Sequence, residues 1–93
     1  MFVEIDDYVV NLARVDNIAI SCCVDDTEEN PWDLSIEIGD DFELRDPVWL
    51  RQGFSTENRA KRFRQDVIRR AFATGICTAE DMDEIFEVAQ QPV

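Results

Sequence analysis

The sequence predicts an α+β fold in which an antiparallel β-meander of four to five strands precedes two C-terminal helices. Two observations support this prediction. Apolar residues alternate with polar ones through the first half of the 93-residue chain, as they do in half-buried strands. Further along they recur at helical spacing, so we expect a sheet at about 2–46, and helices at about 56–74 and 79–90 packed on one of its faces.

The N-terminal part of the predicted sheet begins with two short apolar runs, at 2–5 and 8–12. A double aspartate separates them, which is typical of the tight turn in a β-hairpin. Residues 18–24 are apolar on both faces, so we expect a strand in the interior of the sheet. The polar stretch 25–33 is then a loop between this strand and the next.

The second part of the predicted sheet consists of alternating segments at 34–38 and 42–46, with a glycine-containing turn between them. An Asp-Pro pair ends the second segment, because proline cannot continue a hydrogen-bonded strand. Residues 48–54 are expected to be a connector, in which Trp49 and Phe54 pack under the first helix.

Both predicted helices have recognisable ends. Ser55 or Thr56 can cap the first helix, because a side-chain oxygen accepts a hydrogen bond from a free backbone N–H group. Gly75 is the expected C-cap. Thr78 followed three residues later by Asp81 is typical of a capping box and predicts the start of the second helix. The predicted apolar faces consist of Ala60, Phe63, Val67, Ile68, Ala71 and Phe72 in the first helix and Met82, Ile85, Phe86 and Ala89 in the second.

Two short motifs accompany this order of elements: an Asn-Leu-x-x-Val step at 11–15 and a Phe-Ser-x-Glu helix start at 54–57. With these motifs the chain resembles a group of small, mostly uncharacterised bacterial and phage proteins over about residues 2–72. The resemblance implies the α+β fold, and it carries no catalytic residue.

Length and composition predict one domain, 1–93, with a single modest core. The N-terminus has acids where a signal peptide has bases, and no apolar run approaches the ~20 residues of a membrane span. Cys22, Cys23 and Cys77 are an odd number of cysteines, which favours free thiols over a disulfide framework. We therefore expect a cytoplasmic protein with no membrane association.

The residue types in the chain also restrict its chemistry. It has no histidine, which argues against nucleophile–histidine catalysis and against imidazole metal sites. It has no Cys-x-x-Cys pair and no phosphate-binding glycine loop, and the acidic stretch 25–33 lacks the glycine and final glutamate of an EF-hand loop. The sequence therefore predicts a non-enzymatic protein with no cofactor and no metal.

Charge is divided into three blocks along the chain. The net charge of −12 arises from −12 over residues 1–50, +5 over residues 51–75 and −5 over residues 76–93. A structural explanation of the basic block is a helix whose bases pair with the acids of the sheet beneath it and whose stems cover apolar surface. The other explanation is a basic face that binds an anion. That face consists of Arg59, Arg62, Arg69 and Arg70. Direct binding of nucleic acid is disfavoured, because the rest of the chain repels a polyanion.

The acids of the first block fall mostly in predicted turns, where they face solvent and can gather into a negative patch. Such a patch steers toward a basic partner such as a nucleic-acid-binding groove. Small acidic inhibitors from phage and mobile elements, among them anti-restriction and anti-CRISPR proteins, use this physics. The predicted partner-binding residues are Asp25, Asp26, Glu28, Glu29, Asp40 and Asp41, with Trp32 as an exposed anchor.

Two alternatives to this binding function stay open. The acids can simply keep a small domain in solution. The chain can also be a self-assembling or scaffold subunit, such as a homodimer, in which the basic helix of one copy docks on an acidic surface of another. Complementary charge blocks within one chain motivate the second alternative.

Overall fold

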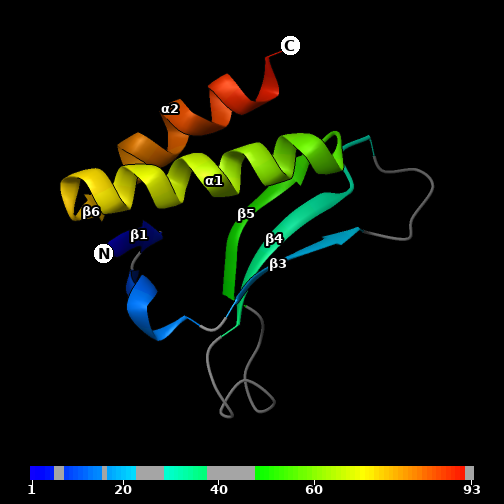
Figure 1. The fold of residues 1–93 in the computed structure, drawn as a ribbon. Helices are drawn as coiled ribbons and strands as arrows, with labels where there is room; N and C mark the ends of the chain where they lie inside the picture. The colour runs from blue at the N-terminus through cyan, green and yellow to red at the C-terminus, as the bar shows by residue number, and fades with distance from the viewer. Residues whose placement is uncertain (6–7, 16, 23–28, 38–47, 92–93) are drawn as a thin grey trace.

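The computed structural model contains an α+β arrangement of six strands, a short 3₁₀ helix and two α-helices in the part of the chain that it describes (Figure 1). The described residues are 1–5, 8–15, 17–22, 29–37 and 48–91. The predicted fold class is confirmed, with the strands divided between two three-stranded sheets.

The first sheet has the order β2-β1-β6 and joins the N-terminal hairpin to a short strand that lies between the two helices in the sequence. Strands β1 (Phe2–Ile5) and β2 (Tyr8–Asn11) form the predicted antiparallel hairpin. Strand β6 (Ile76–Cys77) follows the first helix and pairs with β1 in parallel, so that Val3 lies opposite Cys77. A two-residue strand has no periodicity of its own, so β6 cannot be recognised from the sequence pattern.

The second sheet is antiparallel, with the order β3-β4-β5. Its strands are β3 (Asn17–Cys22), β4 (Trp32–Glu37) and β5 (Val48–Phe54). The prediction of a connector at 48–54 was wrong, because these residues form β5. Two register shifts against β4 and a positive φ of 92° at Gly53 interrupt the alternation by which a strand is recognised. The predicted strand at 42–46 lies outside the described residues.

Helix α1 (Glu57–Thr74) begins and ends as the sequence predicts. The hydroxyl of Thr56 accepts a hydrogen bond of 3.2 Å from the backbone N–H of Arg59. At the other end Gly75 adopts φ 85°, and its N–H donates to the carbonyl of Ala71. The left-handed conformation favours glycine because it has no Cβ.

Helix α2 (Ala79–Gln90) begins with the predicted capping box. The Asp81 N–H donates to the Thr78 hydroxyl at 3.2 Å, and the Thr78 N–H donates to the Asp81 carboxylate at 3.1 Å. This backbone hydrogen bond is the main reason that the pKa of Asp81 lies below its usual value. The box holds the start of α2 in a fixed position, which matters for the surface that the helix presents.

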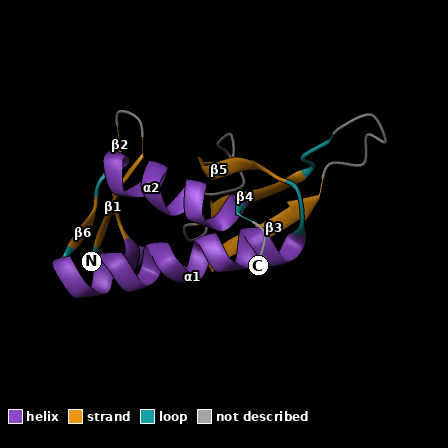
Figure 2. Cartoon of the chain, turned by 90° about the horizontal axis from the view of Figure 1, so that it is seen from above, coloured by secondary structure: helices purple, strands orange, loops and turns teal. Residues whose placement is uncertain are grey.

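The core joins the helices to both sheets. Figure 2 shows β1, β2 and β6 beside one end of the helix pair and β3, β4 and β5 beside the other. Phe54 of β5, Phe63 of α1 and Phe86 of α2 form an aromatic cluster with ring centroids 5.2–6.0 Å apart. Phe54 and Phe63 are fully buried, so the cluster ties the two helices to the second sheet.

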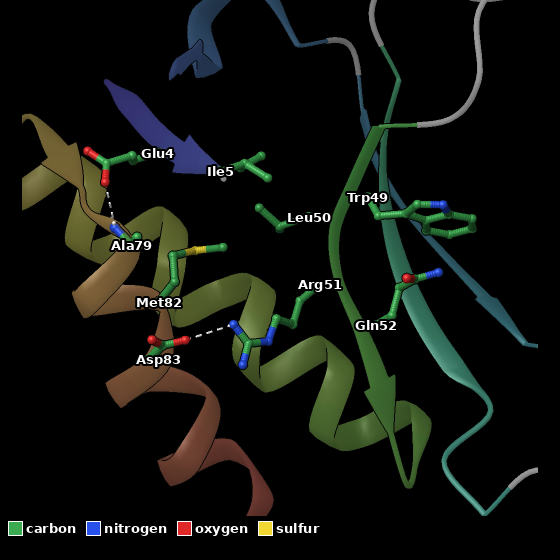
Figure 3. Close-up of a pocket in the computed structure, with 9 residues that line it drawn as sticks. All are labelled: Glu4, Ile5, Trp49, Leu50, Arg51, Gln52, Ala79, Met82 and Asp83. Atoms are coloured by element: carbon green, nitrogen blue, oxygen red, sulfur yellow. Dashed lines mark hydrogen bonds and ion pairs between the residues drawn. The ribbon is translucent and has the colours of Figure 1, made fainter. Parts of the chain in front are cut away.

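Three apolar side chains lie outside the positions expected for them. Phe72 and Ile68, expected on the apolar stripe of α1, are 78% and 39% exposed. They lie one position beyond the buried Ala71 and Val67, and therefore about 100° further around the helix. Trp49, expected under the first helix, is 37% exposed, whereas Phe54 is buried as expected. Figure 3 shows that the Trp49 side chain points away from α2, on the other side of β5.

Candidate functional site

The side of α2 that lies opposite its buried face is rich in acids. Its carboxylates recur at helical spacing on the side opposite the buried face of the helix, and each belongs to an exposed residue. We define the acidic face of α2 as Glu80, Asp83, Glu84 and Glu87. Helix α2 contains no base at all, so these charges are not neutralised from within the helix.

Beside the acidic face lies a half-open cleft of about 310 Å³ between α2, β1 and β5 (Figure 3). Ile5, Leu50 and Met82 give it an apolar wall, and Ile5 and Leu50 point toward one another across it. Glu4 lies at its edge, where its carboxylate accepts a hydrogen bond of 3.4 Å from the backbone N–H of Ala79. The N-terminal end of α2 favours this negative charge.

An ion pair connects the acidic face to the second sheet. Nη1 of Arg51 lies 2.9 Å from Oδ1 of Asp83, and the Arg51 guanidinium lies 4.2 Å from the centre of the Phe86 ring. Stacking on the ring and pairing with the carboxylate hold Arg51 in place. The Asp83 side chain is nevertheless 70% exposed, so it still presents its charge to solvent.

The predicted partner-binding residues are only partly within the described chain. Glu29 is exposed at a bend just before β4. Trp32 is half-buried and packs against the core, so less of its ring is available as an anchor than expected. Their role in binding stays a prediction. The remaining predicted residues, Asp25, Asp26, Glu28, Asp40 and Asp41, lie outside the described residues.

The predicted basic face of α1 is partly neutralised by nearby acids. Arg69 lies 3.8 Å from Asp66, one turn earlier, and Arg70 lies 3.6 Å from Asp81 of α2. Within the described chain, the acids that pair with the α1 bases belong to the two helices. The expectation that they belong to the sheet was therefore wrong for these pairs.

The other bases of α1 have different contacts. Arg59 donates to the Ser55 hydroxyl at 2.8 Å, and Arg64 donates to the Ile18 carbonyl of β3 at 3.0 Å. Lys61 lies 3.2 Å from Glu57, one turn earlier. Arg62, the remaining member of the predicted basic face, is half-buried. The contact of α1 with the second sheet thus includes a hydrogen bond to a backbone carbonyl.

The cysteine chemistry of the described residues is limited. Burial, reinforced by the nearby negative charge of Asp81, raises the pKa of Cys77 to about 11. A thiol with that pKa is almost entirely protonated at neutral pH and is a poor nucleophile. Cys22 is exposed on β3. No group of three or more metal-ligating side chains occurs among the residues that the structure describes.

The acidic face of α2 is the feature that reasoning from the sequence missed. The pattern is nevertheless visible in the sequence, because acids at 80, 83, 84 and 87 recur with the period of the helix predicted at 79–90. The binding site predicted from the sequence lies instead among the turn acids of the N-terminal half.

Comparison of the chain with family models, curated proteins and solved structures finds no match. The resemblance to small bacterial and phage proteins therefore stays a prediction. Among the described helices, none has both the length and the apolar character needed to cross a membrane.

Proposed function

We propose that this chain is a small, acidic, non-enzymatic binding protein that engages a basic surface of another protein. The observation that supports the proposal is the acidic face of α2: four exposed carboxylates on one helix that contains no base. A dense array of one sign of charge accelerates encounter with a surface of the opposite sign and repels surfaces of its own sign.

The contacts that hold α2 in place suit a helix that binds a partner. Its first turn is fixed by the capping box of Thr78 and Asp81, and Phe86 anchors its middle in the aromatic cluster. A helix held in this way keeps its backbone in one arrangement, so little backbone conformational entropy is lost when a partner binds. Glu4 extends the negative charge past the edge of the cleft.

More specifically, we propose that the partner is a nucleic-acid-binding protein and that this chain inhibits it. Grooves that bind phosphates are lined with Lys and Arg, and an acidic helix competes with the nucleic acid for those side chains. The turn acids Asp25, Asp26, Glu28 and Glu29, together with Asp40 and Asp41, add to the negative charge in this proposal.

The first test is capture of proteins from a lysate of the native host on the immobilised chain, washed at low and then raised salt. We expect retention of a basic nucleic-acid-binding protein that leaves as the salt concentration rises, because screening weakens the attraction. The captured protein is then mixed with its nucleic acid and titrated with the chain in a gel-shift assay. Displacement of the nucleic acid supports inhibition, whereas a ternary complex contradicts it.

Two matched variants locate the binding surface. Glu80→Gln with Glu87→Gln removes two charges from the acidic face, and Glu37→Gln with Glu57→Gln removes two charges elsewhere. We expect the first variant to lose most of the capture and the second to keep it. Equal capture by both variants and by the unmodified chain would show that the acidic face is not the binding surface.

A further inference from the structure

The two helices enclose a second hollow, on the side of α2 that faces α1. This groove of about 530 Å³ is lined by Ala73 of α1 and by Ile85 and Val88 of α2, and Val88 is 42% exposed. Its rims are charged, with Arg69 and Arg70 on α1 and Glu84 on α2. An apolar floor between polar rims is typical of a protein interaction surface.

The helices on either side of this groove carry opposite charges. Helix α1 has six bases and two acids, a net charge of +4, whereas α2 has five acids and no base, a net charge of −5. They lie side by side and run in opposite directions (Figure 1). Among the charged residues that line the groove, α1 contributes Arg69 and Arg70 with one acid, Asp66, and α2 contributes Glu84, so the bases lie on the α1 side and Glu84 on the α2 side.

A surface divided in this way is complementary to itself. The geometry points to a homodimer in which the groove sides of two copies pack together around a two-fold axis parallel to the helices, so that α1 of each copy lies over α2 of the other. In such a symmetric interface the same patch serves both subunits. The four helices then have antiparallel neighbours throughout, as in an up-and-down four-helix bundle.

Charge selects this arrangement over the other two-fold packing. If α1 of one copy lay over α1 of the other, Arg69 and Arg70 of the two copies would face each other, as would the two Glu84 side chains, and like charges in an interface are costly. With α1 over α2, each basic helix meets an acidic one. The pairs Arg69–Asp66 and Arg70–Asp81, at 3.8 and 3.6 Å, are surface pairs that contribute little and can be exchanged for contacts with the second copy.

Exposed apolar side chains give the proposed dimer interface apolar surface to bury, in addition to its complementary charges. Ala73 of α1 and Val88 of α2, which both line the groove, are exposed. A second copy that covers these side chains removes apolar surface from water, which favours association. The dimer does not rest on the proposed function, although a second copy and a basic partner would compete for α2.

The test is the mass of the purified full-length chain by sedimentation equilibrium over a range of concentrations. We expect a monomer–dimer equilibrium. Ala73→Glu places a carboxylate in the apolar floor of the groove at an exposed helix position, and we expect it to raise the dissociation constant at least about tenfold. Gln52→Glu makes the same charge change at an exposed site on β5 and should leave the constant unchanged. Circular dichroism checks that both variants fold.

A charge exchange distinguishes the two packings. Arg69→Glu should weaken the dimer if α1 lies over α2, and adding Glu84→Arg to it should restore the dimer. If α1 lies over α1, Arg69→Glu relieves repulsion and strengthens association, which would overturn the proposed arrangement. A monomeric mass at concentrations up to about 1 mM, or a dimer that Ala73→Glu leaves intact, would overturn the interface itself.

Discussion

Helices α1 and α2 are built by the same local rules and present opposite surfaces. Each begins at a threonine cap, and each buries an apolar face in the shared core. Their charges are nevertheless +4 and −5. Because capping and burial determine the fold without reference to these charges, the opposite surfaces are free to serve interactions with other molecules.

The contact that the two helices share is most sensitive to loss of Phe63. Its ring is fully buried between Phe54 and Phe86, so Phe63→Ala leaves a cavity and should lower the free energy of unfolding by about 3–5 kcal/mol. Phe72→Ala, at a 78% exposed position of the same helix, should change it by no more than about 0.5 kcal/mol. Urea unfolding of dilute samples measures both. Equal losses would contradict the packing of α1.

The N-caps of the two helices differ in the number of hydrogen bonds that they make. Thr78→Ala breaks a reciprocal capping box, and we expect it to cost about 1–2 kcal/mol. Thr56→Ala removes the single side-chain bond to Arg59 and should cost about 1 kcal/mol or less. Thermal or urea unfolding of the two variants gives the order. A larger loss for Thr56→Ala would show that the box is not the stronger cap.

The turn from α1 into β6 depends on Gly75. Its φ of 85° is strained for an alanine, although no atom lies close to where a Cβ would be placed. Gly75→Ala should therefore cost about 1 kcal/mol from backbone strain alone. Gly75→Asn should cost less, because asparagine tolerates the left-handed region better. A neutral Gly75→Ala in urea unfolding would contradict this turn geometry.

The smallest effect at neutral pH concerns Cys77, which lies just before α2. Its folded pKa of about 11 exceeds the ordinary value of 9.0, so the protonated thiol favours the folded state. That contribution is complete below pH 9.0 and is lost as the pH rises toward about 11. Unfolding of the wild type and of Cys77→Ala at several alkaline pH values checks this. The variant should lack this alkaline loss, and parallel pH profiles would contradict it.

Sequence reasoning worked where one local interaction determines the structure. The caps at Thr56 and Thr78 and the stop at Gly75 each follow from a backbone group that needs a partner or a positive φ. It failed where distant segments determine the outcome. Strand β6 exists only because β1 lies beside it, and bulges against β4 conceal the period of β5.

The solvent exposure of individual side chains could not be predicted from the local sequence pattern either. Phe72 and Ile68 fit a helical stripe by spacing, yet the sheet covers a narrower arc of α1 than that stripe. The candidate site shows the same limit. The helical period of the α2 acids was readable from the sequence, whereas the positions of Glu4 and Arg51 beside them required the fold.

The acidic face of α2 is the surface that we propose binds a basic protein. The most direct measurement is quantitative mass spectrometry of proteins retained from host lysate by three immobilised chains. These are the wild type, a variant with Glu80→Gln, Glu84→Gln and Glu87→Gln, and a variant with Arg62→Gln and Arg69→Gln. We predict that the α2 variant loses the basic proteins and that the α1 variant keeps them. Loss from the α1 variant with retention by the α2 variant would contradict the claim.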